Sequence, residues 1–242
     1  MKNMTWTREV RVRYNADVAV IGGGMAGVSA ACAAAHEGAS VVLVERFAVT
    51  GGNATVGGVA NWSGETAGQG AVFDQITAMQ EAWGSIEPYP GPARGFDNSR
   101  RVFDHEILAV ILQELLRQHG VRLLLHTRFV DVQRHGRRLG PALVCGTSGV
   151  EALQARVFID TSGCAQLAHA ARCTMLPQAQ FGDLPPSLMY FVRECPDAQP
   201  QLPDGWFGPV TDQADLPLTS GSTMPHRASA CERHAGFWAT TS

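Results

Sequence analysis

Apolar runs and helical stretches alternate at the start of the chain. Residues 17–21 form a short apolar run rich in β-branched residues, which predicts a buried parallel strand. Residues 28–37 are dominated by alanine and are followed by Gly38, which predicts a helix that ends at this glycine. Residues 40–44 form a second strand-like run that ends at Glu45. This order predicts a βαβ unit.

An amphipathic helix and several strands are expected in the middle of the chain. Asp104 is a good N-cap residue. It precedes a stripe of apolar residues at helical spacing, formed by Ile107, Leu108, Ile111, Leu112, Leu115 and Leu116. Strand-like runs follow at residues 121–125, 127–132, 139–147 and 151–158, of which the second and third are expected to pair as a hairpin. Strands alternating with helices predict an α/β fold, a Rossmann-like doubly wound sheet.

Composition narrows the class of protein. The chain has 242 residues, of which 45% are hydrophobic and 17% are charged, so a packed core is expected. Its net charge of -3 supplies no basic surface for a nucleic acid. The six cysteines form no C-x-x-C pair and the histidines no ligand spacing, so no metal centre is predicted. No apolar run near the N-terminus suits a signal or membrane segment, so a cytoplasmic location is expected.

A glycine-rich loop follows the first strand directly. Residues 22–27 are Gly-Gly-Gly-Met-Ala-Gly, which fits the pattern G-x-G-x-x-G. Gly22 allows a tight turn, Gly24 lets the backbone approach a pyrophosphate, and Gly27 lets the helix lie close to the sheet. The N-terminus of the helix would then present its N–H groups and the positive end of its dipole to the phosphates.

Glu45 ends the second strand, roughly 20 residues beyond the glycines, where a carboxylate accepts the hydroxyls of a ribose. An acidic residue there favours an unphosphorylated ribose, and thus FAD or NAD over NADP. The alternative is a glycine turn in an α/β protein that binds no nucleotide.

A second glycine pair carries a resemblance to a known family. Gly51 and Gly52 resemble the second phosphate-side loop of FAD proteins in the glutathione-reductase structural group. Residues 17–64, with Gly-Gly-Asn-Ala-Thr at 51–55, resemble the broad FAD-dependent oxidoreductase family related to the flavin-binding chain of heterodisulfide reductase. The resemblance implies FAD as the cofactor. It also implies a binding site made of Gly22, Gly24, Met25, Ala26, Gly27, Glu45, Arg46, Gly51, Gly52, the backbone near Val130, and Gly163.

The resemblance continues downstream and implies two domains. Residues 158–163, Phe-Ile-Asp-Thr-Ser-Gly, resemble the family's strand that ends in Ala-Thr-Gly, and residues 187–191 resemble the first strand of its substrate-side domain. The implied FAD-binding domain spans residues 16–175, with a β-rich excursion at about 127–150. Residues 176–242 would form a partial substrate-side segment, with loop or disorder expected from Pro196 onward.

The chain departs from the family in three places. Cys164 stands where relatives usually have an acidic residue, and we interpret it as a small residue in a turn rather than a redox thiol. Ala54 and Val59 stand where disulfide reductases of the group have a redox cysteine pair, which excludes their mechanism. The Gly-Asp segment that closes the family's FAD domain is missing. Our hypothesis is an amino-terminal fragment, or one half of a split enzyme whose partner chain supplies the rest.

The expected activity is therefore hydride transfer between a small organic substrate and bound flavin, with no side chain assigned a catalytic role. One alternative is a truncated or split nucleotide-binding subunit without catalytic activity. An NAD-dependent dehydrogenase is disfavoured by the Gly51-Gly52 pair and by the excursion that follows the second helix.

Overall fold

A computed structural model describes residues 4, 7–63, 68–88 and 101–175, together with the backbone of residues 187–192 and 235–240. The chain divides into two compact units, Met1–Met175 and Leu176–Ser242.

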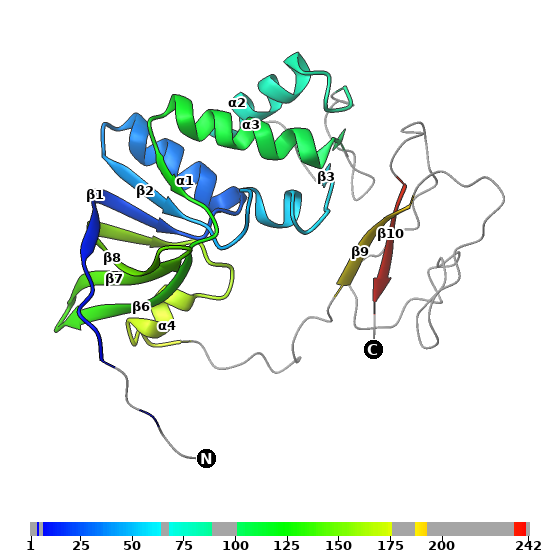
Figure 1. The fold of residues 1–242 in the computed structure, drawn as a ribbon. Coiled ribbons are helices and arrows are strands. Elements are labelled where there is room, and N and C mark those ends of the chain that lie inside the picture. The colour runs from blue at the N-terminus through cyan, green and yellow to red at the C-terminus, as the bar shows by residue number, and fades with distance from the viewer. Residues whose placement is uncertain are drawn as a thin grey trace. The chain divides into compact units, whose positions relative to one another are not determined.

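A six-stranded mixed sheet lies at the centre of the first unit (Figure 1). Its parallel strands are β1 (Val12–Ile21), β2 (Val41–Val44), β5 (Arg122–Leu124) and β8 (Gly149–Asp160). Its antiparallel hairpin is formed by β6 (Arg128–His135) and β7 (Arg138–Gly146). The strand order is β5-β2-β1-β8-β7-β6. The expected α/β sheet and the expected hairpin are thus confirmed, and the hairpin continues the same sheet.

Both faces of the central strands are covered, which explains their unbroken apolar sequence. Side chains alternate between two core clusters along β1, with Val20 in one cluster and Ala19 and Ile21 in the other. All three are almost completely buried. The first strand extends further back than the expected residues 17–21, because its amino-terminal half pairs with β8 from Val12 onward.

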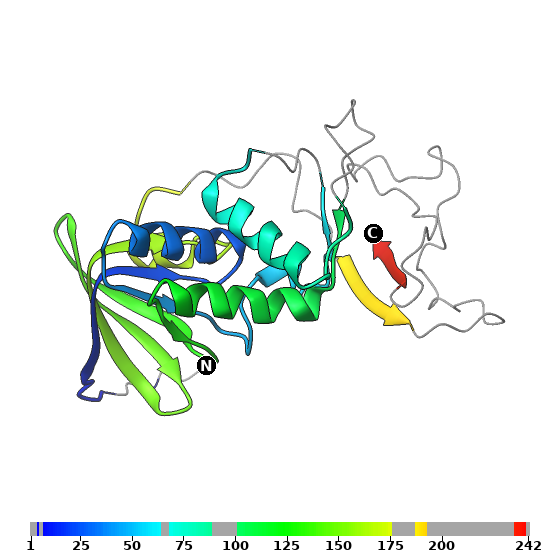
Figure 2. The ribbon, with the colours of Figure 1, turned by 90° about the horizontal axis from the view of Figure 1, so that it is seen from above.

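Helices cover the two faces unequally. The first core cluster contains side chains of α1 (Met25–His36), α2 (Ala71–Ala82) and α3 (His105–Gln118). Figure 2 shows α1 and α3 running alongside each other over the sheet. The second cluster is completed by side chains of the β6–β7 hairpin and of α4 (Gln166–Ala170). The sheet is therefore wound on both sides, as the doubly wound class requires.

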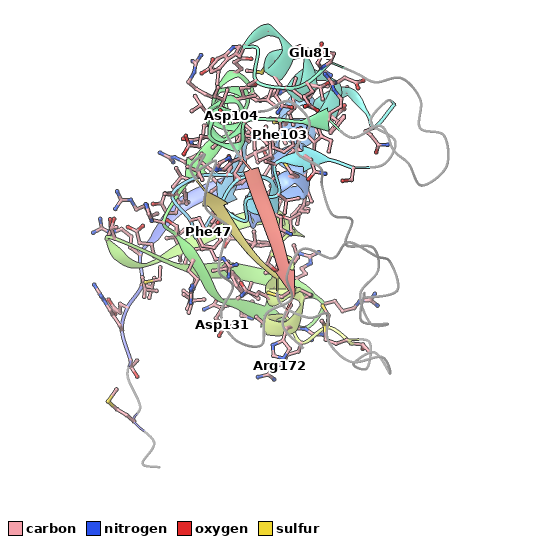
Figure 3. All side chains as sticks on the ribbon, turned by 90° about the vertical axis from the view of Figure 1, so that its right-hand side faces the viewer. Phe47, Glu81, Phe103, Asp104, Asp131 and Arg172 are labelled. Atoms are coloured by element: carbon pink, nitrogen blue, oxygen red, sulfur yellow. The ribbon has the colours of Figure 1, made fainter. Side chains whose placement is uncertain are left out.

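The ends of two helices follow the sequence signals. The Asp104 side chain caps α3, because its Oδ1 accepts hydrogen bonds from the N–H groups of Glu106 (2.9 Å) and Ile107 (3.0 Å). Asp104 lies beside Phe103 where the chain enters α3 (Figure 3). Helix α1 ends at His36, and Gly38 follows in the left-handed region.

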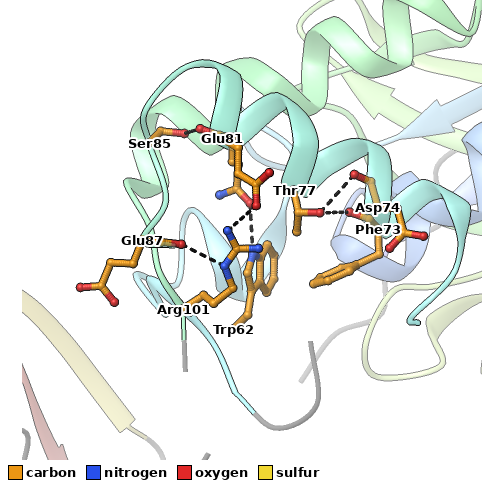
Figure 4. A network of polar contacts seen from close by, with 9 residues as sticks. Trp62, Phe73, Asp74, Thr77, Glu81, Ser85, Glu87 and Arg101 are labelled. Atoms are coloured by element: carbon orange, nitrogen blue, oxygen red, sulfur yellow. Dashed lines mark hydrogen bonds and ion pairs between the residues drawn. The ribbon is translucent and has the colours of Figure 1, made fainter. Parts of the chain in front are cut away.

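Helix α2 is an element that the apolar pattern does not predict. Its inward face carries two polar residues, Thr77 and Gln80, which interrupt the apolar stripe. Gln80 is fully buried, and its Oε1 accepts a hydrogen bond from the Trp62 indole (3.1 Å). The buried Arg101 guanidinium forms an ion pair with Glu81 (2.6 Å), as Figure 4 shows. Two short strands accompany this helix, β3 (Asn61–Trp62) and β4 (Arg101–Val102), which pair antiparallel.

The second unit contains a two-stranded antiparallel sheet of β9 (Ser187–Val192) and β10 (Ala235–Thr240). The strand expected at 187–191 is present. The expectation of loop or disorder from Pro196 onward is wrong for residues 235–240, which gain their strand structure from pairing with β9 rather than from a periodic pattern of their own. The rest of that tail lies outside the described residues.

Replacing Asp104 with alanine tests the cap of α3. The two backbone N–H groups that Asp104 accepts lose their partner, so D104A should lower the free energy of unfolding by about 1 kcal/mol. Urea denaturation measures this change. The matched D104S variant keeps an oxygen acceptor and should lose much less, whereas equal losses in the two variants would contradict the capping role.

Candidate functional site

The glycine loop between β1 and α1 is packed so closely that side chains do not fit at two positions. Gly22 has φ +105°, and a Cβ there would lie 2.4 Å from the carbonyl oxygen of Thr161. A Cβ on Gly27 would lie 1.9 Å from the carbonyl oxygen of Gly22. The loop therefore requires glycine at both positions for steric reasons that hold without any ligand.

Gly24 differs from these two glycines. An added Cβ there would meet no protein atom within 4 Å, and φ is an ordinary -65°. Gly24 is also the N-cap of α1, which has no side-chain cap and no acidic residue in its first turn. The positive end of the α1 dipole thus faces open space at Gly24, which suits the approach of an anion.

The Glu45 carboxylate joins the glycine loop to the end of β2. Glu45 is only 5% exposed. Its Oε2 accepts a hydrogen bond from the Gly23 N–H (2.6 Å), and its Oε1 accepts one from the Phe47 N–H (2.8 Å). Each carboxylate oxygen can accept more than one hydrogen bond, so both keep capacity for ribose hydroxyls.

The second glycine pair lies directly against the first loop. The Gly51 N–H donates to the Gly23 carbonyl (2.7 Å), and Gly51 itself has φ +108°. A Cβ on Gly52 would lie 3.1 Å from the Cα of Gly24. The structure therefore brings residues of both glycine motifs and Glu45 to one place at the carboxyl ends of β1 and β2.

The end of β8 completes this place from the other side. The Thr161 hydroxyl lies 2.7 Å from the Gly22 carbonyl oxygen and 3.0 Å from that of Ile21. Gly163 follows two residues later and is exposed, as is Cys164. The thiol of Cys164 lies 3.8 Å from the Ser162 carbonyl in this turn.

Asp160 fixes the turn that carries Thr161. Its Oδ1 accepts hydrogen bonds from the Ser162 hydroxyl (2.6 Å) and N–H (3.0 Å), and its Oδ2 accepts one from the Ala168 N–H (3.0 Å). Burial by itself raises the pKa of Asp160, but the hydrogen bonds of Ser162, Ala168 and Leu167 outweigh it and lower the pKa below its ordinary value.

Val130 lies in a β-bulge of β6. The register of β6 and β7 passes from Phe129 to Asp131 and leaves Val130 without a partner residue on β7. Val130 also borders a hollow of about 380 Å³, which is lined by Phe129, Val130, Cys164, Gln166, His169 and Ala170. The bulge exposes the backbone at the position where the sequence predicts a backbone contact.

Three other predicted residues differ in what they offer. The Met25 side chain packs against the first core cluster, while Ala26 beside it is exposed. Arg46 is exposed, and its guanidinium carbon lies 4.6 Å from the centre of the Phe47 ring. The side chain of Met25 is therefore committed to the core, and Arg46 remains accessible.

Sequence reasoning missed Thr161 and Asp160 as residues of the site. Both contact residues far away in the chain or hold a local turn, so no spacing motif identifies them. The available signal was the strand order, since neighbouring parallel strands such as β1 and β8 bring their carboxyl ends to the same edge of a sheet.

Two searches of the described residues gave no site. No group of three or more His, Cys, Asp and Glu side chains is arranged there to hold a metal ion. No helix in the same part of the chain has the length and apolar character needed to cross a membrane.

A family model matches most of the chain. It is described as FAD dependent oxidoreductase and covers residues 17–210. No curated protein matches the sequence.

Solved structures share the fold at low sequence identity. A geranylgeranyl bacteriochlorophyll reductase-like protein from Thermoplasma acidophilum is 18% identical, with a TM-score of 0.55 over 74% of this chain and 47% of that chain. The flavin-dependent brominase Bmp2 is 18% identical, with a TM-score of 0.53 over 76% of this chain and 48% of that chain. CabE, an aromatic hydroxylase from angucycline biosynthesis, is 20% identical, with a TM-score of 0.50 over 72% and 41%. The chain thus spans less than half the length of these three structures.

Alanine substitutions should separate the two kinds of glycine in the loop. G27A forces a Cβ against the Gly22 carbonyl and should cost about 3 kcal/mol of stability or prevent folding. G24A meets no protein atom and should cost about 1 kcal/mol or less, as for alanine at an N-cap. Thermal and urea unfolding measure both, and equal losses would contradict the packing described.

The Asp160 turn should give stability that depends on pH. Because the pKa of Asp160 is lowered in the folded protein, its contribution is complete above the unfolded pKa of about 4 and is lost as pH falls through the folded pKa. D160N should therefore be less stable than the wild type by about 1 kcal/mol at pH 7, with a smaller difference below pH 4. A difference that does not depend on pH in urea titrations would contradict this role of the carboxylate.

Proposed function

The chain belongs to the family of FAD-dependent oxidoreductases, whose cofactor is FAD, and on this premise we propose that it transfers hydride between a small organic substrate and bound FAD. The observation that supports the proposal best is the convergence of both glycine motifs and Glu45 at one edge of the sheet.

The residues present fit the pyrophosphate of FAD. Gly24 leaves open space at the N-terminus of α1, where a side chain would otherwise stand. Gly52 approaches Gly24 closely enough for both backbones to border the same space. We propose that Gly22, Gly24 and Gly27 shape the pyrophosphate site together with Gly51 and Gly52, and that the α1 dipole stabilises the negative charge.

The adenosine half would be held by Glu45 and by backbone groups. We assign the ribose hydroxyls to the Glu45 carboxylate, because both of its oxygens are fixed by backbone N–H groups and still have acceptor capacity. The bulged backbone at Val130 suits a contact with adenine. Arg46, Gly163 and the backbone of Met25 and Ala26 complete the proposed site.

The bound flavin would supply the hydride chemistry, and the described part of the chain would bind and orient it. The names of the solved structures with this fold include a brominase and a hydroxylase as well as a reductase-like protein. Anaerobic loss of the flavin's visible absorbance when a reduced organic substrate is added would support hydride transfer. Turnover that occurs only with O₂, with hydroxylation or halogenation of the substrate, would contradict it.

We also propose a cytoplasmic location and no nucleic-acid partner. Both rest on the sequence, namely the net charge of -3 and the N-terminal residues without a long apolar run. The described cysteines are free thiols, consistent with a reducing compartment.

The FAD site is tested by a side chain that fills the open space at Gly24. The purified wild-type chain should bind FAD saturably and show a perturbed flavin spectrum. G24V should weaken binding by more than about tenfold, equal to about 1.4 kcal/mol, because its side chain enters the pyrophosphate space and not the core.

Ala33→Val is the matched control for this experiment. Ala33 is exposed on the same helix, away from its N-terminus, and the change adds the same branched side chain to a helix. A33V should bind FAD as the wild type does. If G24V bound FAD as tightly as A33V, the pyrophosphate would not lie at Gly24.

A further inference from the structure

The peptide unit between Gly22 and Gly23 is held at both of its ends. Its carbonyl oxygen lies 2.7 Å from the Thr161 hydroxyl. Its N–H donates to the Glu45 carboxylate at 2.6 Å. Because the peptide is planar and trans, these two groups point in opposite directions, so fixing one end fixes the direction of the other.

We propose that Thr161 is a positioning residue for the cofactor, whose hydroxyl sets the orientation of the Gly22–Gly23 peptide and, through it, the position of the Glu45 carboxylate. The inference rests on the proposed FAD site and assigns to it a residue that is 139 positions away from Gly22 in the chain. Thr161 acts through Gly23 and Glu45 and need not touch the cofactor.

The hydroxyl of Thr161 has no freedom to serve another purpose. Its oxygen lies within hydrogen-bonding distance of two carbonyl oxygens, those of Ile21 and Gly22, so its single hydrogen is donated to this pair. The Thr161 N–H also donates to the Ile21 carbonyl (2.9 Å), which ties the residue to the end of β1. A Cβ on Gly27 would lie 2.9 Å from the Thr161 hydroxyl oxygen, so this oxygen also lies at the start of α1.

The following peptide is held in the same manner. The Gly23 carbonyl accepts a hydrogen bond from the Gly51 N–H (2.7 Å). Two consecutive peptides of the loop are thus fixed by three separate segments of the chain, namely the end of β8, the end of β2 and the second glycine pair. Loss of the Thr161 hydroxyl releases the first of these peptides, while the loop's backbone path can remain.

Three variants of the full chain separate the hydroxyl from packing in general. T161A removes the hydroxyl and the methyl group, and T161S removes the methyl group alone. T77A is the matched control, because the Thr77 hydroxyl also donates to backbone carbonyls, those of Phe73 and Asp74, but within α2 and away from the glycine loop (Figure 4).

The dissociation constant for FAD is measured by quenching of flavin fluorescence, and the melting temperature of each variant is measured without FAD. T161A should raise the dissociation constant about fivefold, as expected for one lost hydrogen bond. T161S should stay within about twofold of the wild type. T77A should lower the melting temperature and leave FAD binding unchanged. Equal FAD binding in T161A and T77A, or equal weakening in T161A and T161S, would overturn the inference.

Hydrogen–deuterium exchange of the glycine loop tests the positioning without reference to FAD. Exchange in a peptide that covers residues 22–27 should be faster in T161A than in the wild type, T161S and T77A, because the Gly23 N–H loses its fixed alignment with Glu45. A wild-type chain that binds no FAD would refute the proposed function, and the exchange result would still decide the role of Thr161. Unchanged exchange in T161A would overturn the inference by itself.

Discussion

The close approach of the β1 carboxyl end, the start of α1 and the end of β8 is the constraint on which the rest of the site depends. No side chain fits between these backbones at Gly22 or Gly27, where a Cβ would lie 2.4 Å and 1.9 Å from carbonyl oxygens. Polar groups that are buried at such a junction must be paired, and here the carbonyls of Ile21 and Gly22 are paired with Thr161. Steric fit and hydrogen bonding thus select the same loop conformation.

That conformation has a functional consequence at Gly24 and Glu45. The loop turns so that Gly24 borders open space at the N-terminus of α1, while the Gly23 N–H holds the Glu45 carboxylate in place. A positive helix end and a fixed carboxylate are then presented at the same edge of the sheet. This arrangement suits a ligand with an anionic pyrophosphate and a neutral ribose, which agrees with the FAD-dependent family of the chain.

Local signals in the sequence predicted the elements that local interactions determine. The βαβ unit, the Asp104 cap and the β6–β7 hairpin follow from runs of a few residues, and the structure contains all three. Helix α2 was not predicted because Gln80 and Thr77 occupy its inward face, where Gln80 is satisfied in part by Trp62, a residue outside the helix. Strand β10 was not predicted because its structure depends on β9. The role of Thr161 was not predicted either, since its contact with Gly22 requires the strand order of the sheet.

The central claim is that the glycine loop and Glu45 bind the ADP half of FAD. Calorimetric titration of the purified chain with FAD, ADP and FMN tests it most directly, because ADP contains the pyrophosphate and the adenosine ribose and FMN contains neither. The geometry predicts that ADP binds and displaces FAD from a single site, whereas FMN does not compete. FMN binding as tight as that of FAD, or FAD binding that ADP fails to displace, would contradict the claim.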